Sequence, residues 1–461
     1  MHDFDNFERQ RTQRTLAYDE DSSLAWKVIL VVSLVSIGKN FSTVDLAVSM
    51  GDVQKQEGFT SDQISLLIAA GYMFSIAGKV LGGIASDTVG GRVTCIGGMV
   101  VYSCTTFLFA ALPRGTPFLI YVLLWGCNVL TSLGVLGVSR VTLASNWIPS
   151  SYSGRMMSLV SMSTDLGDAI SRVALTPILF FGWRDVFFVS ALLCFLTGAP
   201  LWLVRESPEE AEIVPSGTCP GAGEGKSEQS FWEKVRPLLS SPMLYALCVL
   251  SGVLYGTRVL FLNYTANFLS LVRCREQVAM GAEDDLSACM TSGSTLAAAA
   301  VASSMFTLVG CASPLLVGTL KDALPQRHRA LPLVAFVFPL VVTLAALAVL
   351  HDRLSYYTAV SLMTIAGACI AGPFKVIGPV FAVDVAGKEG KGTAVSLVGM
   401  CNNAAGVGLI LVKGFLGSDW GVLFGVLATL SLLSLVVASW MWKRDLSIAQ
   451  SKVLTDPLIE H

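Results

Sequence analysis

Charged side chains occur inside long apolar stretches of this 461-residue chain. Lys39 and Arg258 each lie in the middle of such a stretch, and Lys79 and Lys375 lie within two others. A charge at the centre of a bilayer costs at least roughly 2.5–3.5 kcal/mol on insertion scales, so each one indicates a partner or a function. Cations that converge on one site would bind an anion, because Arg offers a bidentate fork to phosphate or carboxylate and Lys a point charge.

Acidic residues occur in the same kind of stretch. Asp45 follows Lys39 by six positions, and Asp165 and Asp168 lie together in another span. A carboxylate in a low-dielectric site can carry a proton, and Asp45 and Asp165 are the better candidates because neither has an obvious partner on its own span. Asp168 and Arg172 are spaced i, i+4, so they are either a structural ion pair or part of the coupling machinery.

Polar and aromatic residues within the spans supply hydrogen bonds and shape. Each of them either lines the same site or serves ordinary packing between helices. The candidates are Tyr72, Tyr255, Asn263, Tyr264, Asn402 and Asn403.

Helices must position these residues, because twelve apolar stretches of membrane-spanning length run through the chain. Hydrophobic residues make up 53% of the sequence, charged residues 14%, and the mean hydropathy is +0.65. Backbone polar groups in hydrocarbon must be satisfied within the segment, so these stretches predict an all-α membrane protein. The predicted spans are residues 25–49, 62–86, 93–112, 116–148, 154–181, 184–204, 242–272, 293–320, 330–350, 355–385, 392–416 and 421–442.

A long polar segment divides the spans six and six. Residues 206–229 are rich in Pro, Gly, Ser and Glu and predict a flexible linker, whereas residues 1–24 predict a disordered tail. The predicted division is a tail at 1–24, a six-helix bundle at 25–205, a linker at 206–241, a second bundle at 242–442 and a tail at 443–461.

The distribution of basic residues predicts the orientation in the bilayer. With the N-terminus inside, seventeen Lys and Arg residues lie in the inside segments against six in the outside segments. This is a positive-inside pattern, so both termini are predicted to be cytoplasmic. Residues 1–24 are polar and show no cleavable signal peptide. The pattern does not distinguish the plasma membrane from an internal membrane.

Several classes of function lack a signature in the sequence. There is no nucleophile–base set, metal cluster, cofactor motif or nucleic-acid signature, so we expect no enzyme, no cofactor and no nucleic-acid partner. The expected partners are a small anionic solute and the lipid bilayer, with the protein acting as a monomer. Cys274 and Cys289 flank the long outside loop and are either bridged or unpaired thiols.

A repeat joins the two halves. The second span of each half ends in G-x-x-x-D, at Gly83 to Asp87 and at Gly318 to Asp322. Two such bundles enclose a central cavity and rock about it. The segment GGIASDTVGGRV, residues 82–93, resembles the signature loop of the major facilitator superfamily.

In that signature Gly83, Asp87, Gly90 and Arg92 match, whereas Thr88 and Gly91 replace basic residues. The resemblance implies the major facilitator fold, with the loop Asp and its basic neighbours latching the cytoplasmic face. The alternative is that the segment around Asp87 is a solvated cytoplasmic turn without a latching role. By the repeat, Asp322 is the second latch candidate.

Closer similarity points to the organophosphate:phosphate antiporters. It rests on KNF in the first span, GFTSDQISLL before the second, Lys79 eight residues before Asp87, and Arg258 in the seventh span. WIPSSYSGRMMSL at 147–159 and VDVAGKEGKGTAVSLVGMCNNAAGVG at 383–408 resemble further stretches of that subfamily. The resemblance implies that Arg258 binds phosphate, with Lys39 and Lys79 nearby.

Two departures from that subfamily favour an anion in general over phosphate in particular. Gly38 stands where the subfamily has a cavity-facing Arg, and Thr164 and Asp165 stand where a His-Asn pair is common. The sequence therefore predicts a secondary active transporter that exchanges or co-transports small anions by alternating access, with an organophosphate exchanged for phosphate as one form of this. The alternative is a proton-coupled symporter of an organic solute.

Overall fold

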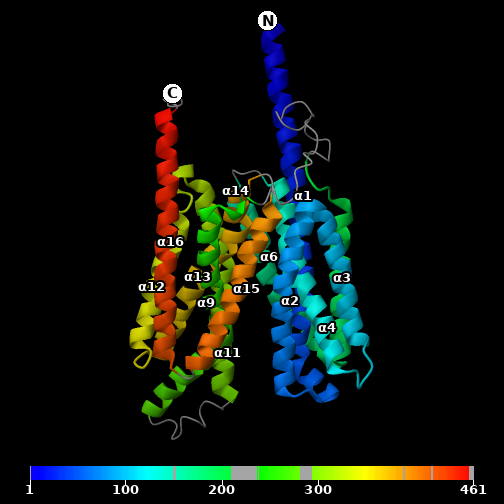
Figure 1. Cartoon of the computed structure of the whole chain (residues 1–461), viewed down its shortest axis with the longest axis vertical. Helices are drawn as coiled ribbons and strands as arrows, with labels where there is room; N and C mark the ends of the chain where they lie inside the picture. The colour runs from blue at the N-terminus through cyan, green and yellow to red at the C-terminus, as the bar shows by residue number, and fades with distance from the viewer. Residues whose placement is uncertain are drawn as a thin grey trace. The chain divides into compact units, whose positions relative to one another are not determined.

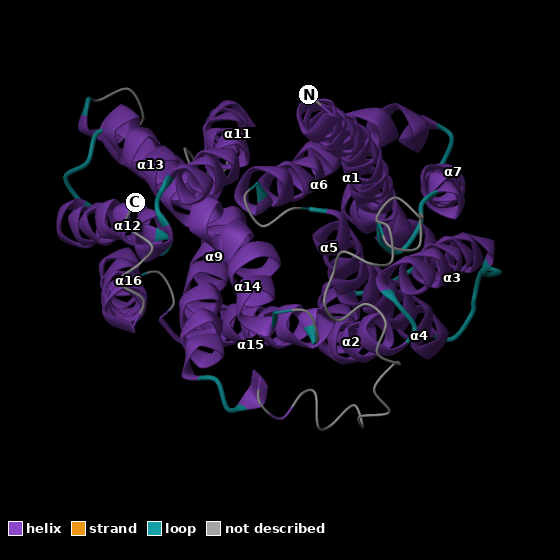
Figure 2. Cartoon of the chain, turned by 90° about the horizontal axis from the view of Figure 1, so that it is seen from above, coloured by secondary structure: helices purple, strands orange, loops and turns teal. Residues whose placement is uncertain are grey.

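The computed structural model describes residues 2–148, 152–208, 236, 238–280, 293–387, 390–416 and 419–455. Every regular element in these ranges is a helix, and none is a strand (Figure 2). Ten helices in the described ranges are long and apolar enough to cross a bilayer. The all-helical membrane fold predicted from the hydropathy is therefore present.

The helices of the first half follow the predicted spans (Figure 1). The fourth span contains a π-helical segment, η1, and the fifth and sixth end in 3-10 turns, η2 and η3. The segments are α1 (His2–Glu57), α2 (Ser61–Thr88), α3 (Gly91–Ala111), α4 (Phe118–Val129), η1 (Leu130–Val135), α5 (Leu136–Trp147), α6 (Ser153–Leu175), η2 (Thr176–Phe180), α7 (Trp183–Gly198) and η3 (Ala199–Leu203).

The second half repeats this arrangement, again with a π-helical segment, η5, in its fourth span. The segments are α9 (Pro242–Ala279), α11 (Gly293–Ala323), η4 (Gln326–His328), α12 (Leu331–Leu350), α13 (Tyr356–Val376), η5 (Ile377–Ala382), α14 (Val383–Ala386), α15 (Lys391–Leu416) and α16 (Trp420–Thr455).

Two of the predicted spans are helices outside these ten. They are α6, with 23 residues, and α11, with 31 residues. α6 is less apolar because it carries four charged residues, Arg155, Asp165, Asp168 and Arg172. Three of these four are the residues singled out above for coupling, so the loss of hydropathy and the candidate chemistry have the same origin.

The prediction of a disordered tail at residues 1–24 was wrong. The structure describes residues from His2 onward as part of α1, and α16 likewise continues past residue 442 to Thr455. Extending an existing helix adds one hydrogen bond for each residue fixed, without the cost of a new nucleus. Polarity alone therefore did not end these helices, because residues 2–24 contain neither Pro nor Gly.

The chain divides into two compact units that are not quite its two sequence halves. Unit 1 comprises Met1–Ser150, Leu166–Leu239 and Ala386–Ser396. Unit 2 comprises Ser151–Asp165, Ser240–Val385 and Leu397–His461. Each half thus gives one short segment to the other unit, and α6 and α15 each continue from one unit into the other.

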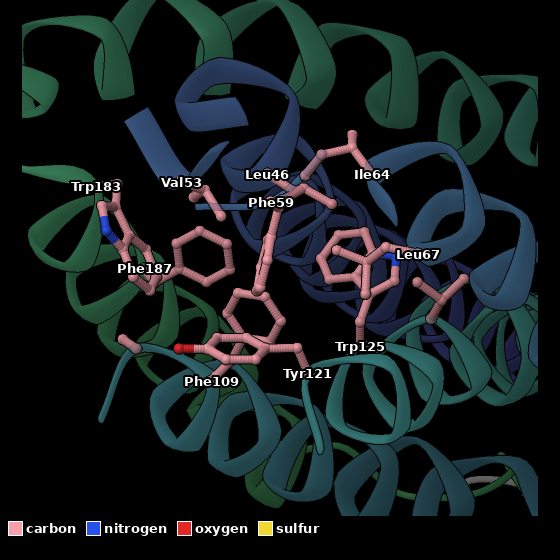
Figure 3. Close-up of a cluster of buried hydrophobic side chains, with 12 residues drawn as sticks. Leu46, Val53, Phe59, Ile64, Leu67, Phe109, Tyr121, Trp125, Trp183 and Phe187 are labelled. Atoms are coloured by element: carbon pink, nitrogen blue, oxygen red, sulfur yellow. The ribbon is translucent and has the colours of Figure 1, made fainter. Parts of the chain in front are cut away.

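An aromatic cluster forms much of the core of unit 1 (Figure 3). Phe109 of α3 stacks on Phe187 of α7 with ring centroids 4.9 Å apart. Tyr121 of α4 meets Phe109 edge-on at 5.4 Å, and Phe59 meets Tyr121 at 5.1 Å. Such offset and edge-on pairs add to the burial of apolar area, so the cluster ties α3, α4 and α7 to the turn between α1 and α2.

Close helix packing in unit 1 requires a glycine on α2. A Cβ atom added at Gly78 would lie 2.1 Å from the carbonyl oxygen of Leu130 in η1. Small residues let helix backbones approach this closely in a bilayer. α2, which carries Lys79 and Asp87, is therefore held directly against the π-helical segment of the fourth span.

Candidate functional site

Three charged side chains of unit 2 meet inside the helices. Asp165 lies on α6, Arg258 on α9 and Lys375 on α13. The Oδ1 atom of Asp165 is 2.5 Å from Lys375 Nζ and 3.3 Å from Arg258 Nη2. All three are largely buried, with side-chain exposures of 9%, 8% and 16% for Asp165, Lys375 and Arg258. We call this set the charged triad; it carries two positive charges and one negative charge.

Neighbouring groups hold the triad in place. Lys375 Nζ also donates to the Ser161 carbonyl at 3.4 Å, and Ser161 Oγ donates to the Lys375 carbonyl at 3.3 Å. The guanidinium carbon of Arg258 lies 5.7 Å from the ring centroid of Phe374, within the range of a cation–π contact. Tyr255 lies against Phe374, with ring centroids 5.2 Å apart. The two cations are therefore oriented by contacts that do not involve Asp165.

The structure brings together two of the four cations predicted to converge. Arg258 and Lys375 share unit 2, whereas Lys39 and Lys79 belong to unit 1. Lys39 is buried, and its backbone carbonyl accepts the hydroxyl of Tyr102 at 2.8 Å. Lys79 is half-buried on α2. A single site containing all four cations stays a prediction.

Asp45 in unit 1 has a different environment from Asp165. It is fully buried, and its Oδ1 accepts the backbone N–H of Leu46 at 2.6 Å. Its Oδ2 has no hydrogen-bond partner among the described residues. The side chains of Tyr102 and Cys194 are near enough to interact electrostatically with Asp45. A buried carboxylate oxygen in this state is a candidate for carrying a proton.

Asp168 and Arg172 form the ion pair that their spacing predicts. Arg172 Nε lies 3.0 Å from Asp168 Oδ2, and the side chains are 55% and 40% exposed, respectively. Its exposure separates it from the buried triad one turn away on the same helix, and a coupling role for it stays a prediction.

Asp87, the acid of the first G-x-x-x-D segment, caps the start of α15. Its carboxylate accepts the backbone N–H groups of Gly392 and Thr393, both at 2.8 Å, and the hydroxyl of Thr393 at 2.6 Å. A carboxylate at a helix N-terminus satisfies otherwise unpaired N–H groups and interacts favourably with the helix dipole. Lys391 beside this cap donates to Asn146 Oδ1 at 3.1 Å. We call these contacts the first cap.

Asp322, the acid of the second repeat, caps the start of α6 in the same way. It accepts the backbone N–H groups of Gly154 at 2.9 Å and Arg155 at 2.8 Å. Lys321 beside it donates to Ser153 Oγ and pairs with Asp384, both at 2.9 Å. The two repeats thus place matching acids on the helix starts that are exchanged between the units. We call these contacts the second cap.

Arg92 does not pair with Asp87 in the described contacts, contrary to the expected role of a basic neighbour of the loop Asp. Its guanidinium donates to the carbonyls of Leu201 at 3.4 Å and Trp202 at 3.0 Å, at the end of the sixth span. Carbonyls at a helix end are unpaired acceptors with partial negative charge, so they compete for a nearby Arg.

Sequence reasoning missed Glu206, which was assigned to the linker. Its carboxylate accepts the backbone N–H groups of Gly91 at 2.8 Å and Arg92 at 2.7 Å, capping α3. Asn146 Nδ2 donates to the same carboxylate at 3.1 Å. The available signal was an acid directly after the sixth apolar span, at the end of that span that lies by the start of α3.

The predicted lining residues fall in several places. Tyr255 joins the triad through Phe374, whereas Tyr264 lies near Lys413 and lines a small apolar cavity with Trp420. Asn402 and Asn403 are buried in unit 2, and Oδ1 of Asn402 has no hydrogen-bond partner among the described residues. Tyr72 is half-buried on α2 of unit 1. The side chain of Asn263 lies outside those that the structure describes.

Cys274 is buried on α9 and takes part in a disulfide bond, so the alternative of an unpaired thiol is wrong for this residue. Cys289 lies outside the described residues. A bond between these two cysteines stays a prediction.

Comparison with known proteins gives relatives that are named as transport proteins. The chain is 25% identical over 247 residues to a chloroplastic protein of Arabidopsis thaliana named sodium-dependent phosphate transport protein 1, a match covering 50% of this chain and 46% of that one. It is 28% identical over 204 residues to the hexuronate transporter of Bacillus subtilis, covering 42% and 46%. The chain thus matches about half the length of these curated relatives.

Solved structures and a family model extend the comparison to most of the chain. The proton:xylose symporter XylE superposes with a TM-score of 0.68 at 13% identity, covering 92% of this chain and 96% of that one. FucP in its outward conformation superposes with a TM-score of 0.67 at 12% identity, covering 89% and 98%. These likenesses show the fold. The model of the Major Facilitator Superfamily matches residues 28–409, and the chain belongs to that family of transporters.

Proposed function

We propose that this secondary transporter carries a small organic anion, which binds at Arg258 and Lys375. One observation carries the proposal: two buried cations from different helices reach the same carboxylate oxygen of Asp165. A site that holds an internal carboxylate in this way has the charge and the donors to hold the carboxylate or phosphate of a solute. The relatives named for phosphate and hexuronate transport support an anion of this class.

The charge of the triad bears on the mode of transport. Exchange with phosphate was predicted because an empty, strongly positive site would disfavour the closed state through repulsion and desolvation. Asp165 reduces the charge of the empty triad from two to one. Return without cargo then meets a smaller penalty, so we favour symport of the anion with a cation over obligatory exchange. Assignment to the organophosphate:phosphate antiporters is the competing proposal.

Asp45 supports a proton as that cation. It is fully buried, and one of its carboxylate oxygens has no hydrogen-bond partner among the described residues. An ionised carboxylate in such a place is far more costly than a protonated one. Proton symport is therefore the mode that this residue favours.

The two caps are proposed to act as latches. In each cap, an aspartate at the end of one helix accepts hydrogen bonds from the start of another helix. These hydrogen bonds can break and re-form without covalent change. The positive-inside pattern places both caps on the cytoplasmic side. In this proposal the caps are intact when that side is closed and release α6 and α15 when it opens.

Uptake into proteoliposomes tests the anion site. The panel comprises glucuronate, glycerol-3-phosphate and inorganic phosphate, each measured with and without unlabelled anion inside the vesicles and with an imposed proton gradient. Arg258→Lys keeps the charge but loses the fork, so uptake should fall by at least about tenfold, the equivalent of one charge-assisted hydrogen bond of about 1.4 kcal/mol.

The matched control is Arg275→Lys on the same helix, where the native Arg pairs with exposed Asp352 at 2.7 Å. That variant should transport normally. Normal uptake by Arg258→Lys would refute the anion site, and stimulation by internal anion in the absence of any proton effect would restore exchange.

A further inference from the structure

Resting on the proposed function, we infer that Asp165 is a replaceable counter-ion whose protonation matches the charge of the bound anion. A monovalent anion binds beside an ionised Asp165, and a divalent anion binds together with one proton that Asp165 takes up. The inference names a specificity determinant, and it makes the number of coupled protons a property of the solute.

The geometry shows that Asp165 occupies the place of an anion. Both cations contact the same oxygen atom, Oδ1, at 2.5 Å and 3.3 Å. A solute carboxylate or phosphate approaching Arg258 and Lys375 must therefore compete with Asp165 for the same donors. Because Ser161 and Phe374 hold the cations independently of Asp165, the donors stay in place when the carboxylate gives them up.

Counting charges gives the stoichiometry. The empty triad carries a net charge of plus one, from Arg258, Lys375 and Asp165. A monoanion brings the site to zero without any proton. A dianion would leave an excess negative charge among helices, which is costly in a low-dielectric site. Protonation of Asp165 removes that excess.

The proton step is balanced within the transport cycle. On binding of a dianion, a hydronium ion of the same aqueous compartment gives its proton to Asp165, forming one O–H bond and leaving water. The solute oxygens take over the hydrogen bonds of Arg258 and Lys375, so both cations stay charged. On the opposite side the solute leaves, Asp165 returns the proton to water and pairs again with the two cations.

Few other groups can take part in this titration. Asp165 is faced by Arg258 from α9, Lys375 from α13 and Cys311 from α11. In this scheme Arg258 and Lys375 are the donors to the bound anion. A thiol next to a site that has just gained negative charge does not ionise. Asp165 is thus the group in this set that binds a proton when a dianion arrives.

The test compares two sugar acids of the same carbon skeleton, glucuronate as the monoanion and glucarate as the dianion. Carboxyl groups have pKa values of about 4 or below, so both solutes stay fully ionised above about pH 5.5. Binding to the full-length purified protein is measured by scintillation proximity between about pH 5.5 and 8. One proton linked through Asp165 makes the ratio of the Kd for glucarate to the Kd for glucuronate fall about tenfold per unit decrease in pH, because a proton taken up at Asp45 would affect both solutes alike.

Two variants identify the group. In Asp165→Asn the site carries two positive charges without a titratable acid, so the ratio of the two Kd values becomes independent of pH. Asp165→Asn combined with Lys375→Gln restores a net charge of one without the acid; it should bind glucuronate and reject glucarate at every pH. The control is Asp352→Asn, an exposed position, which should keep the pH dependence of the native protein.

The outcomes separate this inference from the proposed function. If both anions bind and Arg258→Lys abolishes binding, but the pH dependence is the same for the two solutes or survives in Asp165→Asn, the inference fails and the anion site stands. If neither anion binds the native protein, this inference fails, and so does the proposal that the anion site accepts a sugar acid.

Discussion

Asp165 and Asp45 are buried aspartates in the two units of one transporter, and they differ in how their charge is compensated. Asp165 receives two cations from α9 and α13. Asp45 receives one backbone N–H, and its second oxygen has no hydrogen-bond partner among the described residues. Both residues are less than a tenth exposed.

The contrast teaches that burial of an acid does not define its role. A buried carboxylate that is ion-paired resists removal, because deleting it leaves its partners as uncompensated charges. A buried carboxylate without a charged partner is itself the uncompensated group, and the cheapest remedy is a proton. An ion-paired acid such as Asp165 is suited to exchange places with an anion. A buried acid without a charged partner, such as Asp45, is suited to carry a proton, either throughout the transport cycle or in part of it.

The largest expected effect comes from replacing each acid by leucine. Asp165→Leu leaves two buried cations unpaired and should lower the free energy of unfolding by about 3–5 kcal/mol. Asp45→Leu removes an uncompensated charge, so unfolding should need at least as much free energy as in the native protein. Thermal unfolding of both variants in detergent is the measurement.

Adding an anion sharpens this result. Millimolar glucarate should restore part of the lost stability of Asp165→Leu, because a ligand that binds the folded state stabilises it by mass action. It should have no greater effect on Asp45→Leu than on the native protein. Equal losses in the two leucine variants would break the comparison.

The two caps extend the comparison to helix ends, with a smaller expected effect. Asp87 makes three hydrogen bonds to the start of α15, including one from the Thr393 hydroxyl, whereas Asp322 makes two to the start of α6. Loss of a capping group costs about 0.5–2 kcal/mol. Asp87→Asn should therefore change uptake by about fivefold or more, and Asp322→Asn by less.

Thr88→Val is the matched control for Asp87→Asn. Among the described residues its hydroxyl bonds to the Ile84 and Ala85 carbonyls of α2, and its side chain is exposed. Uptake by this variant should stay normal. A larger effect for Asp322→Asn than for Asp87→Asn would show that the count of hydrogen bonds does not rank the caps.

The smallest expected effect concerns Glu206, an acid at the junction of three helix ends. Glu206→Gln keeps the shape but loses the charge at the start of α3, which should cost about 0.3–1 kcal/mol. A drop in melting temperature of a few degrees is expected in the native background. No drop beyond that of Asp352→Asn would assign the cap of α3 to its hydrogen bonds alone.

Much of the fold followed from hydropathy, and the remainder followed from contacts. The apolar runs predicted the helices because hydrocarbon leaves the backbone no other donor or acceptor. The ends of α1 and α16 were misjudged, since a polar sequence without Pro or Gly continues a helix as readily as it ends one. The G-x-x-x-D repeat places Asp87 and Asp322 at equivalent positions of the two halves, and each accepts backbone N–H groups at a helix start.

The partners of the candidate residues came from tertiary structure. The sequence places Asp165 93 positions from Arg258, and no spacing rule joins α6 to α9 and α13. Tyr255 and Tyr264 looked alike on one predicted helix, yet one lies by Phe374 and the other by Lys413. Glu206 was hidden in a polar linker because a cap is recognised only when the helix start it serves is in place.

The sequence by itself determined the helical class, the two-fold repeat and which charges lie within the spans, because each depends on residues close together in the chain. Only the tertiary structure decided which charges compensate one another and which short segments the two units exchange. The physical reason is that Coulomb attraction and hydrogen bonds act over a few ångströms in space. Membership of the Major Facilitator Superfamily follows from the first kind of information, and the proposed anion site from the second.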